Sequence, residues 1–227
     1  MNKTARVLAL SLALFFCAVA SVRAGTLLPG DSLAPLPFGA VSAGATLVAD
    51  TGDLSYTLLA GSTVKGTGTI RESVFSGDTN NPNAGLTFIF EITDVKTGDI
   101  GRLTSDGYAG WATDVVTGSG SVAPESATRS TLLSDGGDTV GFNFHPQVDV
   151  GRSSSFMIIR TDAAGYGPGD IGLLDSGIDS LQGFSPTATS TAVPEPSSLV
   201  MFLCMAGLAG AYSVSRRANS AAQSQSV

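Results

Sequence analysis

Clusters of Asp and Asn in two glycine-bearing stretches are the side chains of this sequence best suited to binding a metal ion. Asp78, Asn80 and Asn81 form one cluster, and Asp135 and Asp138 flank a Gly-Gly pair in the other. Carboxylate and amide oxygens on a turn are the hard ligands that Ca²⁺ prefers, but neither stretch has a complete calcium-loop consensus. The same residues form turns without a metal, because their side chains bond nearby backbone groups. Calcium binding and plain turn formation are therefore two hypotheses for these residues.

Three aromatic residues, Tyr108, Trp111 and Tyr166, are candidates for contact with a glycan. The apolar face of a sugar ring can stack on a flat side chain, and Tyr and Trp also offer a polar group at the ring edge. A tryptophan in a β-sandwich is more commonly part of the core. The sequence leaves both interpretations open.

Residues for catalysis are few. Glu72, Glu91 and Asp94 include the two carboxylates that a glycosidase needs, but combinations of this kind arise by chance in a chain with 19 acidic residues. His145 is the only histidine, and no Gly-x-Ser-x-Gly motif is present. The stretch Gly66–Arg71 lacks the third glycine of a dinucleotide-binding loop. We therefore predict that the protein is not an enzyme, with calcium as the one candidate cofactor.

The elements that would position these side chains are short strands separated by turns. In Thr87–Val95, Phe88, Phe90 and Ile92 alternate with more polar residues, as expected for a strand with one buried face. Ser155–Thr161 is apolar on both sides, which predicts a strand buried on both faces. The other predicted strands are Thr46–Asp50, Leu54–Leu59, Ser62–Phe75, Tyr108–Thr117, Thr128–Leu133 and Val140–Phe144.

Turn residues separate these strands, at positions 77–85, 134–138 and 165–170. No stretch in this part of the chain has helical periodicity. The spacing predicts one all-β domain over residues 25–184, built as an antiparallel two-sheet sandwich, of which the jelly roll is one form.

Charge and cysteine content narrow the class of partner. Five of the twelve basic residues lie in the terminal segments, which leaves seven against all 19 acidic residues, a net charge of −12. Such a domain should repel nucleic acid. Cys17 and Cys204 both lie in the terminal apolar segments, so the domain between them can form no disulfide and no Cys-ligated metal site.

The N-terminus predicts export. Lys3 and Arg6 precede an apolar run that ends in small residues, as in a secretory signal peptide over residues 1–24. Signal peptidase would cleave between Ala24 and Gly25, although a cut after Ala20 also fits.

The C-terminus predicts a membrane segment. The tract 185–192 is rich in Ser, Thr and Ala with one Pro, which indicates a linker. An uncharged stretch follows, and we expect a transmembrane helix over residues 198–214. The basic pair after it places residues 218–227 in the cytoplasm. On charge and hydropathy alone, an ordinary single-pass anchor explains this segment.

Residues 193–217 also carry a family resemblance. Val193-Pro194-Glu195-Pro196, the short apolar span and the pair Arg216-Arg217 resemble the PEP-CTERM sorting signal of Gram-negative bacteria. The tail over 218–227 is longer than that family usually has. The resemblance implies that a membrane-embedded exosortase recognises Pro-Glu-Pro, cleaves near it and releases the domain to the cell surface or an exopolysaccharide matrix. It implies a β-rich exported domain and no particular reaction.

Taken together, the sequence predicts an exported structural or interaction protein of the cell surface or extracellular matrix. Its expected partners are signal peptidase, an exosortase and extracellular polysaccharide, and it would reside in the inner membrane before processing. A calcium-assisted carbohydrate-binding module and a plain single-pass membrane-anchored ectodomain are the alternatives.

Overall fold

The structure, a computed structural model, describes residues 25–37 and 39–188. These residues belong to the first of two units of the chain, which divide after Ser190. The predicted signal peptide with Ala24, the sorting signal over 193–217 and the tail over 218–227 lie outside the described residues. Within the described ranges, no helix is long and apolar enough to span a lipid bilayer.

Strands dominate the described residues, and the single helix among them, α2, is one turn long. The all-β prediction is therefore confirmed. The elements are β1 (Gly25–Thr26), β2 (Ser32–Leu33), β3 (Thr46–Asp50), β4 (Leu54–Ala60), β5 (Thr63–Ser76), β6 (Thr87–Thr97), β7 (Asp99–Ser105), β8 (Thr113–Thr117), β9 (Ser126–Arg129), α2 (Leu132–Asp135), β10 (Val140–Asp149), β11 (Met157–Thr161), β12 (Gly165–Leu174) and β13 (Ile178–Thr187).

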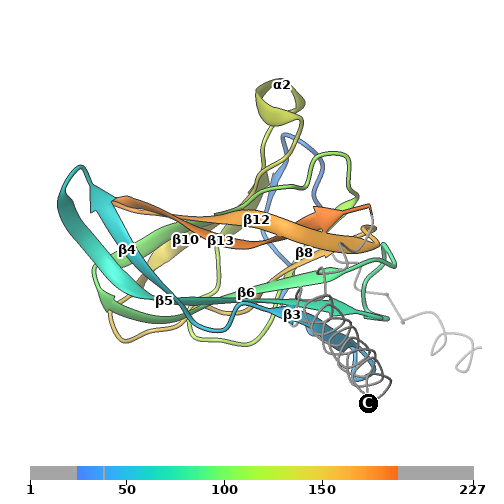
Figure 1. The fold of residues 1–227 in the computed structure, drawn as a ribbon, viewed down its shortest axis with the longest axis horizontal. Coiled ribbons are helices and arrows are strands. Elements are labelled where there is room, and N and C mark those ends of the chain that lie inside the picture. Colours follow the sequence, from blue (N-terminus) through green and yellow to red (C-terminus); the bar gives the residue numbers. More distant parts are fainter. Residues whose placement is uncertain (1–24, 38, 189–227) are drawn as a thin grey trace, which may run out of the picture. The chain divides into compact units, whose positions relative to one another are not determined.

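All strands belong to one large antiparallel sheet, in the order β1-β8-β11-β6-β5-β4-β13-β12-β7-β10-β9-β2, with β3 beside β5. Between β4 and β13 only one residue pair, Leu59 with Ile178, is in register. The sheet folds over at this contact, so that β12 and β13 lie above β5 and β6 (Figure 1). The result is sandwich-like, but its two layers are one continuous sheet rather than the two separate sheets that the sequence predicted.

The hydrophobic core lies between the two layers. In β6, Phe88, Phe90 and Ile92 are fully buried, whereas Ile89 and Glu91 face the opposite side because side chains alternate along a strand. Burying each large apolar side chain contributes roughly 1.5–3 kcal/mol. The alternation predicted for this segment is confirmed. The second layer contributes Leu103, Phe142, Ile171 and Leu173 to the same core.

The prediction of a turn at Gly165–Asp170 is wrong, because this stretch is the first half of β12. Pro168 pairs with Phe184 of β13, while β7 pairs with β12 only from Ile171 onward. At Pro168 the side of β12 that faces away from β13 therefore has no strand partner. A proline, which lacks the N–H group, is tolerated at such a position. β13 in turn extends to Thr187, so residues 185–187 are strand and not linker.

Two other predicted strands are shorter than expected, and β7 was not predicted. Of Tyr108–Thr117 only Thr113–Thr117 is a strand, and the strand predicted to reach Leu133 ends at Arg129. Beyond that point the Thr131 hydroxyl accepts a hydrogen bond from the Ser134 amide at 3.3 Å, which caps the N-terminus of α2. Local side-chain bonding of this kind competes with strand formation.

Candidate binding groove

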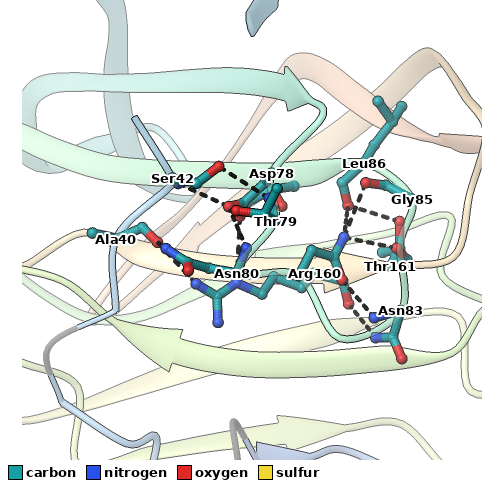
Figure 2. Close-up of polar contacts among 12 residues, drawn as sticks. Ala40, Ser42, Asp78, Thr79, Asn80, Asn83, Gly85, Leu86, Arg160 and Thr161 are labelled. Atoms are coloured by element: carbon teal, nitrogen blue, oxygen red, sulfur yellow. Dashed lines mark hydrogen bonds and ion pairs between the residues drawn. The ribbon is translucent and has the colours of Figure 1, made fainter. Parts of the chain in front are cut away.

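The first predicted calcium cluster is fully engaged in protein contacts (Figure 2). The Asp78 side chain is buried and accepts hydrogen bonds from the amides of Ser42 and Asn80 at 2.8 and 3.0 Å. It also accepts one from the Thr87 hydroxyl at 3.0 Å, and it lies 3.6 Å from the Arg160 Nε atom. These four contacts give Asp78 a structural role in holding the loop between β5 and β6 against its neighbours.

The asparagines of this cluster turn their amide groups toward backbone carbonyls. Asn81 Nδ2 donates to the carbonyls of Gly85, Leu86 and Thr161 at 2.9–3.2 Å. Asn80 Nδ2 donates to the Ala40 carbonyl at 3.0 Å. Both side chains fix the loop between β5 and β6 to its neighbours. Figure 2 shows Asn80 beside Ala40. These contacts support the turn interpretation of the cluster, and calcium binding there stays a prediction.

The second predicted calcium cluster also serves local structure. Asp135 accepts hydrogen bonds from the amides of Gly137 and Asp138 at 3.2 Å and from the Thr139 hydroxyl at 3.0 Å. Side-chain hydrogen bonds, first that of Ser130, lower the pKa of Asp135. Asp138 accepts from the Ala109 amide at 3.2 Å. Across residues 25–37 and 39–188, no group of three His, Cys, Asp or Glu side chains is arranged to hold a metal ion.

The three aromatic residues predicted to contact a glycan do not form a platform. Tyr108 is fully buried and packs edge-on against Phe88, with ring centroids 6.0 Å apart. Tyr166 packs in the same way against Phe184, at 5.5 Å, and Trp111 lies half-buried in the turn before β8. Tyr108 therefore belongs to the core, whereas Trp111 does not. Contact of these residues with a glycan stays a prediction.

The paired carboxylates proposed for a glycosidase are also separated. In the register of β5 and β6, Arg71 pairs with Glu91 and Glu72 pairs with Phe90. Glu72 therefore points into the core with Phe90, while Glu91 points to the outer face. Carboxylates on opposite faces of one layer cannot flank a single glycosidic bond. His145 is exposed on β10.

A groove of about 390 Å³ lies on the outer face of β5, β6 and β11. Of the residues that line it, only Glu91 was considered as a catalytic residue from the sequence. Ile158 of β11 pairs with Ile89 of β6, which pairs with Ser73 of β5. Residues in one row across a sheet share a face, so these three side chains form the floor. Other residues lining the groove are Gly39, Ala40, Val41, Arg71, Phe75, Glu91, Ser119 and Phe156.

Two phenyl rings lie on either side of this floor. Phe75 follows Ser73 by two residues on β5, and Phe156 precedes Ile158 by two residues. Counted along the strands, they fall on opposite sides of the row formed by Ile158, Ile89 and Ser73. Phe156 is 36% exposed, so its ring is accessible to a ligand. The groove thus presents two aliphatic side chains between two aromatic ones.

Charged side chains close one end of the groove. Arg71 donates to both carboxylate oxygens of Asp50, with Nε to Oδ1 at 3.0 Å and Nη2 to Oδ2 at 2.5 Å. This bond lowers the pKa of Asp50 and raises that of Arg71. Partial burial raises the pKa of Glu91, although Arg71 acts against the shift and Asp53 reinforces it. Three carboxylates therefore surround one guanidinium, and this end of the groove is net acidic.

One wall of the groove is the backbone of residues 39–42, which the Asp78 cluster holds in place. The Ala40 carbonyl accepts hydrogen bonds from Arg160 Nη2 at 2.9 Å and from Asn80 Nδ2 at 3.0 Å (Figure 2). The Gly39 amide donates to the Thr117 carbonyl at 2.7 Å. The residues first considered as metal ligands therefore position the groove, without contacting what lies in it.

A second buried carboxylate, Asp114, lies next to this wall. It pairs with Arg160 in the register of β8 and β11, and neither of its carboxylate oxygens has a hydrogen-bond partner. Burial raises the pKa of Asp114 to about 6, with Arg160 acting in the opposite direction. Register alone brings this residue to the groove wall, and no motif in the sequence marks it.

Comparison of the chain with protein-family models, with curated proteins and with solved structures found no match.

Proposed function

We propose that this chain is an exported interaction protein of the cell surface or extracellular matrix, sorted and cleaved by an exosortase, whose β-sandwich domain binds a ligand in the outer-face groove. The arrangement of an N-terminal signal, Pro194-Glu195-Pro196, an apolar span and Arg216-Arg217 supports the sorting route. The transmembrane helix over 198–214 and the jelly-roll form of the sandwich remain predictions.

The groove is the observation that carries the binding function. Small-molecule sites are typically concave, mostly apolar and equipped with a few convergent polar groups, with volumes of roughly 300–1,000 Å³. The groove has this composition, since Ile89, Ile158 and Phe156 line it together with Arg71 and Glu91. Its floor is on a rigid sheet and its wall is fixed by buried hydrogen bonds, so the site is formed before a ligand arrives.

A calcium-assisted carbohydrate-binding module is the alternative function. Asp78 and Asp135, two of the residues proposed to bind calcium, accept hydrogen bonds from the protein, and calcium assistance stays a prediction. The groove provides a different place for a glycan, away from Tyr108. A plain membrane-anchored ectodomain would share the domain and differ in processing, so the sorting signal is the feature to test.

The test replaces Pro194, Glu195 and Pro196 together by Ala in the native host. We expect the wild-type domain in the surface or matrix fraction and the triple variant at full length in the inner membrane. Replacing three residues of the tail after Ala218 by Ala or Ser provides a matched control, which should sort as the wild type does. Equal distribution of the triple variant and the wild type would contradict the proposal.

A further inference from the structure

We infer that the groove takes an amine-bearing saccharide, an inference that rests on the binding function proposed above. Three features of the groove support this ligand class: the strands that form its floor, the apolar surface that they present and the sign of the charge at its end. Each limits the choice of ligand in a different way.

The strands under the groove offer no backbone groups to a ligand. β6 lies between β5 and β11, and β11 lies between β6 and β8. Over Ser73–Phe75, β5 lies between β3 and β6. An extended peptide that adds a strand needs an unpaired sheet edge, and the floor has none. The floor therefore recognises a ligand through side chains, which favours a compact ligand with its own apolar face over an extended main chain added as a strand.

The floor suits the flat apolar side of a sugar ring. Ile89 is partly exposed on the floor beside the buried Ile158, and Phe75 and Phe156 lie on either side of this row. The C–H groups on one side of a pyranose ring pack against such surfaces, while its hydroxyls point outward along the ring edge. Ser73 and Ser119 line the groove and provide neutral hydrogen-bonding partners for these hydroxyls.

The charge at the groove end selects among saccharides. Arg71 forms an ion pair with both oxygens of Asp50, which compensates its positive charge. The Glu91 carboxylate, in contrast, accepts no hydrogen bond from any described residue, and Asp53 adds further negative charge nearby. A protonated amine on the sugar would satisfy Glu91 and reduce the repulsion among the carboxylates. A uronic acid would increase that repulsion.

Calorimetric titration of the full-length protein, purified in detergent, tests this inference at about pH 6. The probes are a glucosamine trimer, its N-acetylated counterpart and a galacturonic acid trimer. We expect the glucosamine trimer to bind about fivefold more tightly than the N-acetylated one, as for a partly exposed charge pair. Glu91→Gln should remove this difference, whereas Glu125→Gln, at an exposed residue that does not line the groove, should not. The galacturonic acid trimer should not bind measurably.

The outcomes separate this inference from the proposed function. Equal binding of the two glucosamine-based trimers, unchanged by Glu91→Gln but lost in Phe156→Ala, would overturn the amine preference and leave the groove as the site. Binding of a lysine-containing tripeptide but of no trimer, again lost in Phe156→Ala, would overturn the saccharide class. Trimer binding that neither variant alters would place the site elsewhere and overturn both proposals.

Discussion

Replacing Glu72 by Gln should make the stability of the domain depend much less on pH. Glu72 lies on β5 in the core, with one carboxylate oxygen accepting a hydrogen bond from the Phe184 amide at 2.8 Å and the other without a partner. Burial raises its pKa to about 8, the bond from Phe184 opposes this shift, and Asp106 adds to it. The folded chain therefore holds a proton on Glu72 that the unfolded chain releases near pH 4.5.

The sign and size of the effect follow from this difference. Because the folded state binds one more proton than the unfolded state between pH 4.5 and 8, the unfolding free energy falls as the pH rises through this window. At about 1.4 kcal/mol per pH unit, Glu72 lowers the unfolding free energy by roughly 5 kcal/mol at pH 8 relative to pH 4.5. Gln keeps the shape and the acceptor for Phe184 but carries no titrating proton, so this loss should disappear.

Urea denaturation of residues 25–190 at several pH values from 5 to 8 measures the effect. The difference in unfolding free energy between Glu72→Gln and the wild type should increase with pH by several kcal/mol. A difference that is the same at every pH reflects only the loss or gain of contacts and is not part of this prediction. Glu125→Gln changes an exposed carboxylate and should leave the slope unchanged. A Glu72→Gln variant whose unfolding free energy runs parallel to that of the wild type would refute the reasoning.

Two further changes test the residues around the groove wall. Asp114→Asn should raise the unfolding free energy above about pH 6 and have little effect near pH 4. Burial raises the pKa of Asp114 to about 6, so the wild type loses stability as the pH rises to that value. A lower unfolding free energy of the variant above pH 6, measured in the same denaturation series, would contradict this prediction. Arg160→Met should lower the unfolding free energy by about 3–5 kcal/mol, because it leaves Asp78 buried and unpaired. Adding Asp78→Asn to Arg160→Met should recover part of this loss in urea titrations, and a double variant less stable than the single one would count against the ion pair.

The strands could be predicted where apolar and polar residues alternate. β3 and β6 follow the predicted segments closely, and β11 is buried on both faces as expected, because a period of two is a local property of the sequence. β12 was missed because its glycines and Pro168 are typical of turns. Pro168 fits the strand because β7 pairs with β12 only from Ile171 onward, so the first half of β12 is locally at an edge. Edge position depends on the whole topology, which the sequence does not state.

The groove could not be predicted for a related reason. Its floor joins Ser73, Ile89 and Ile158, which lie far apart in the sequence and meet only through strand register. Residues that looked chemically promising, such as Asp78, owe their pattern to the loop that they stabilise. Asp and Asn on turns suit a metal and a backbone equally well, so composition alone could not separate the two.

The intact mass of the protein from surface and matrix fractions, with and without the host's exosortase, tests the account most directly. We predict a product that begins near Gly25, ends close to Pro196 and reaches the matrix only when the exosortase is present. A chain that keeps its C-terminus to Val227 and stays in the membrane of both hosts would contradict the sorting function.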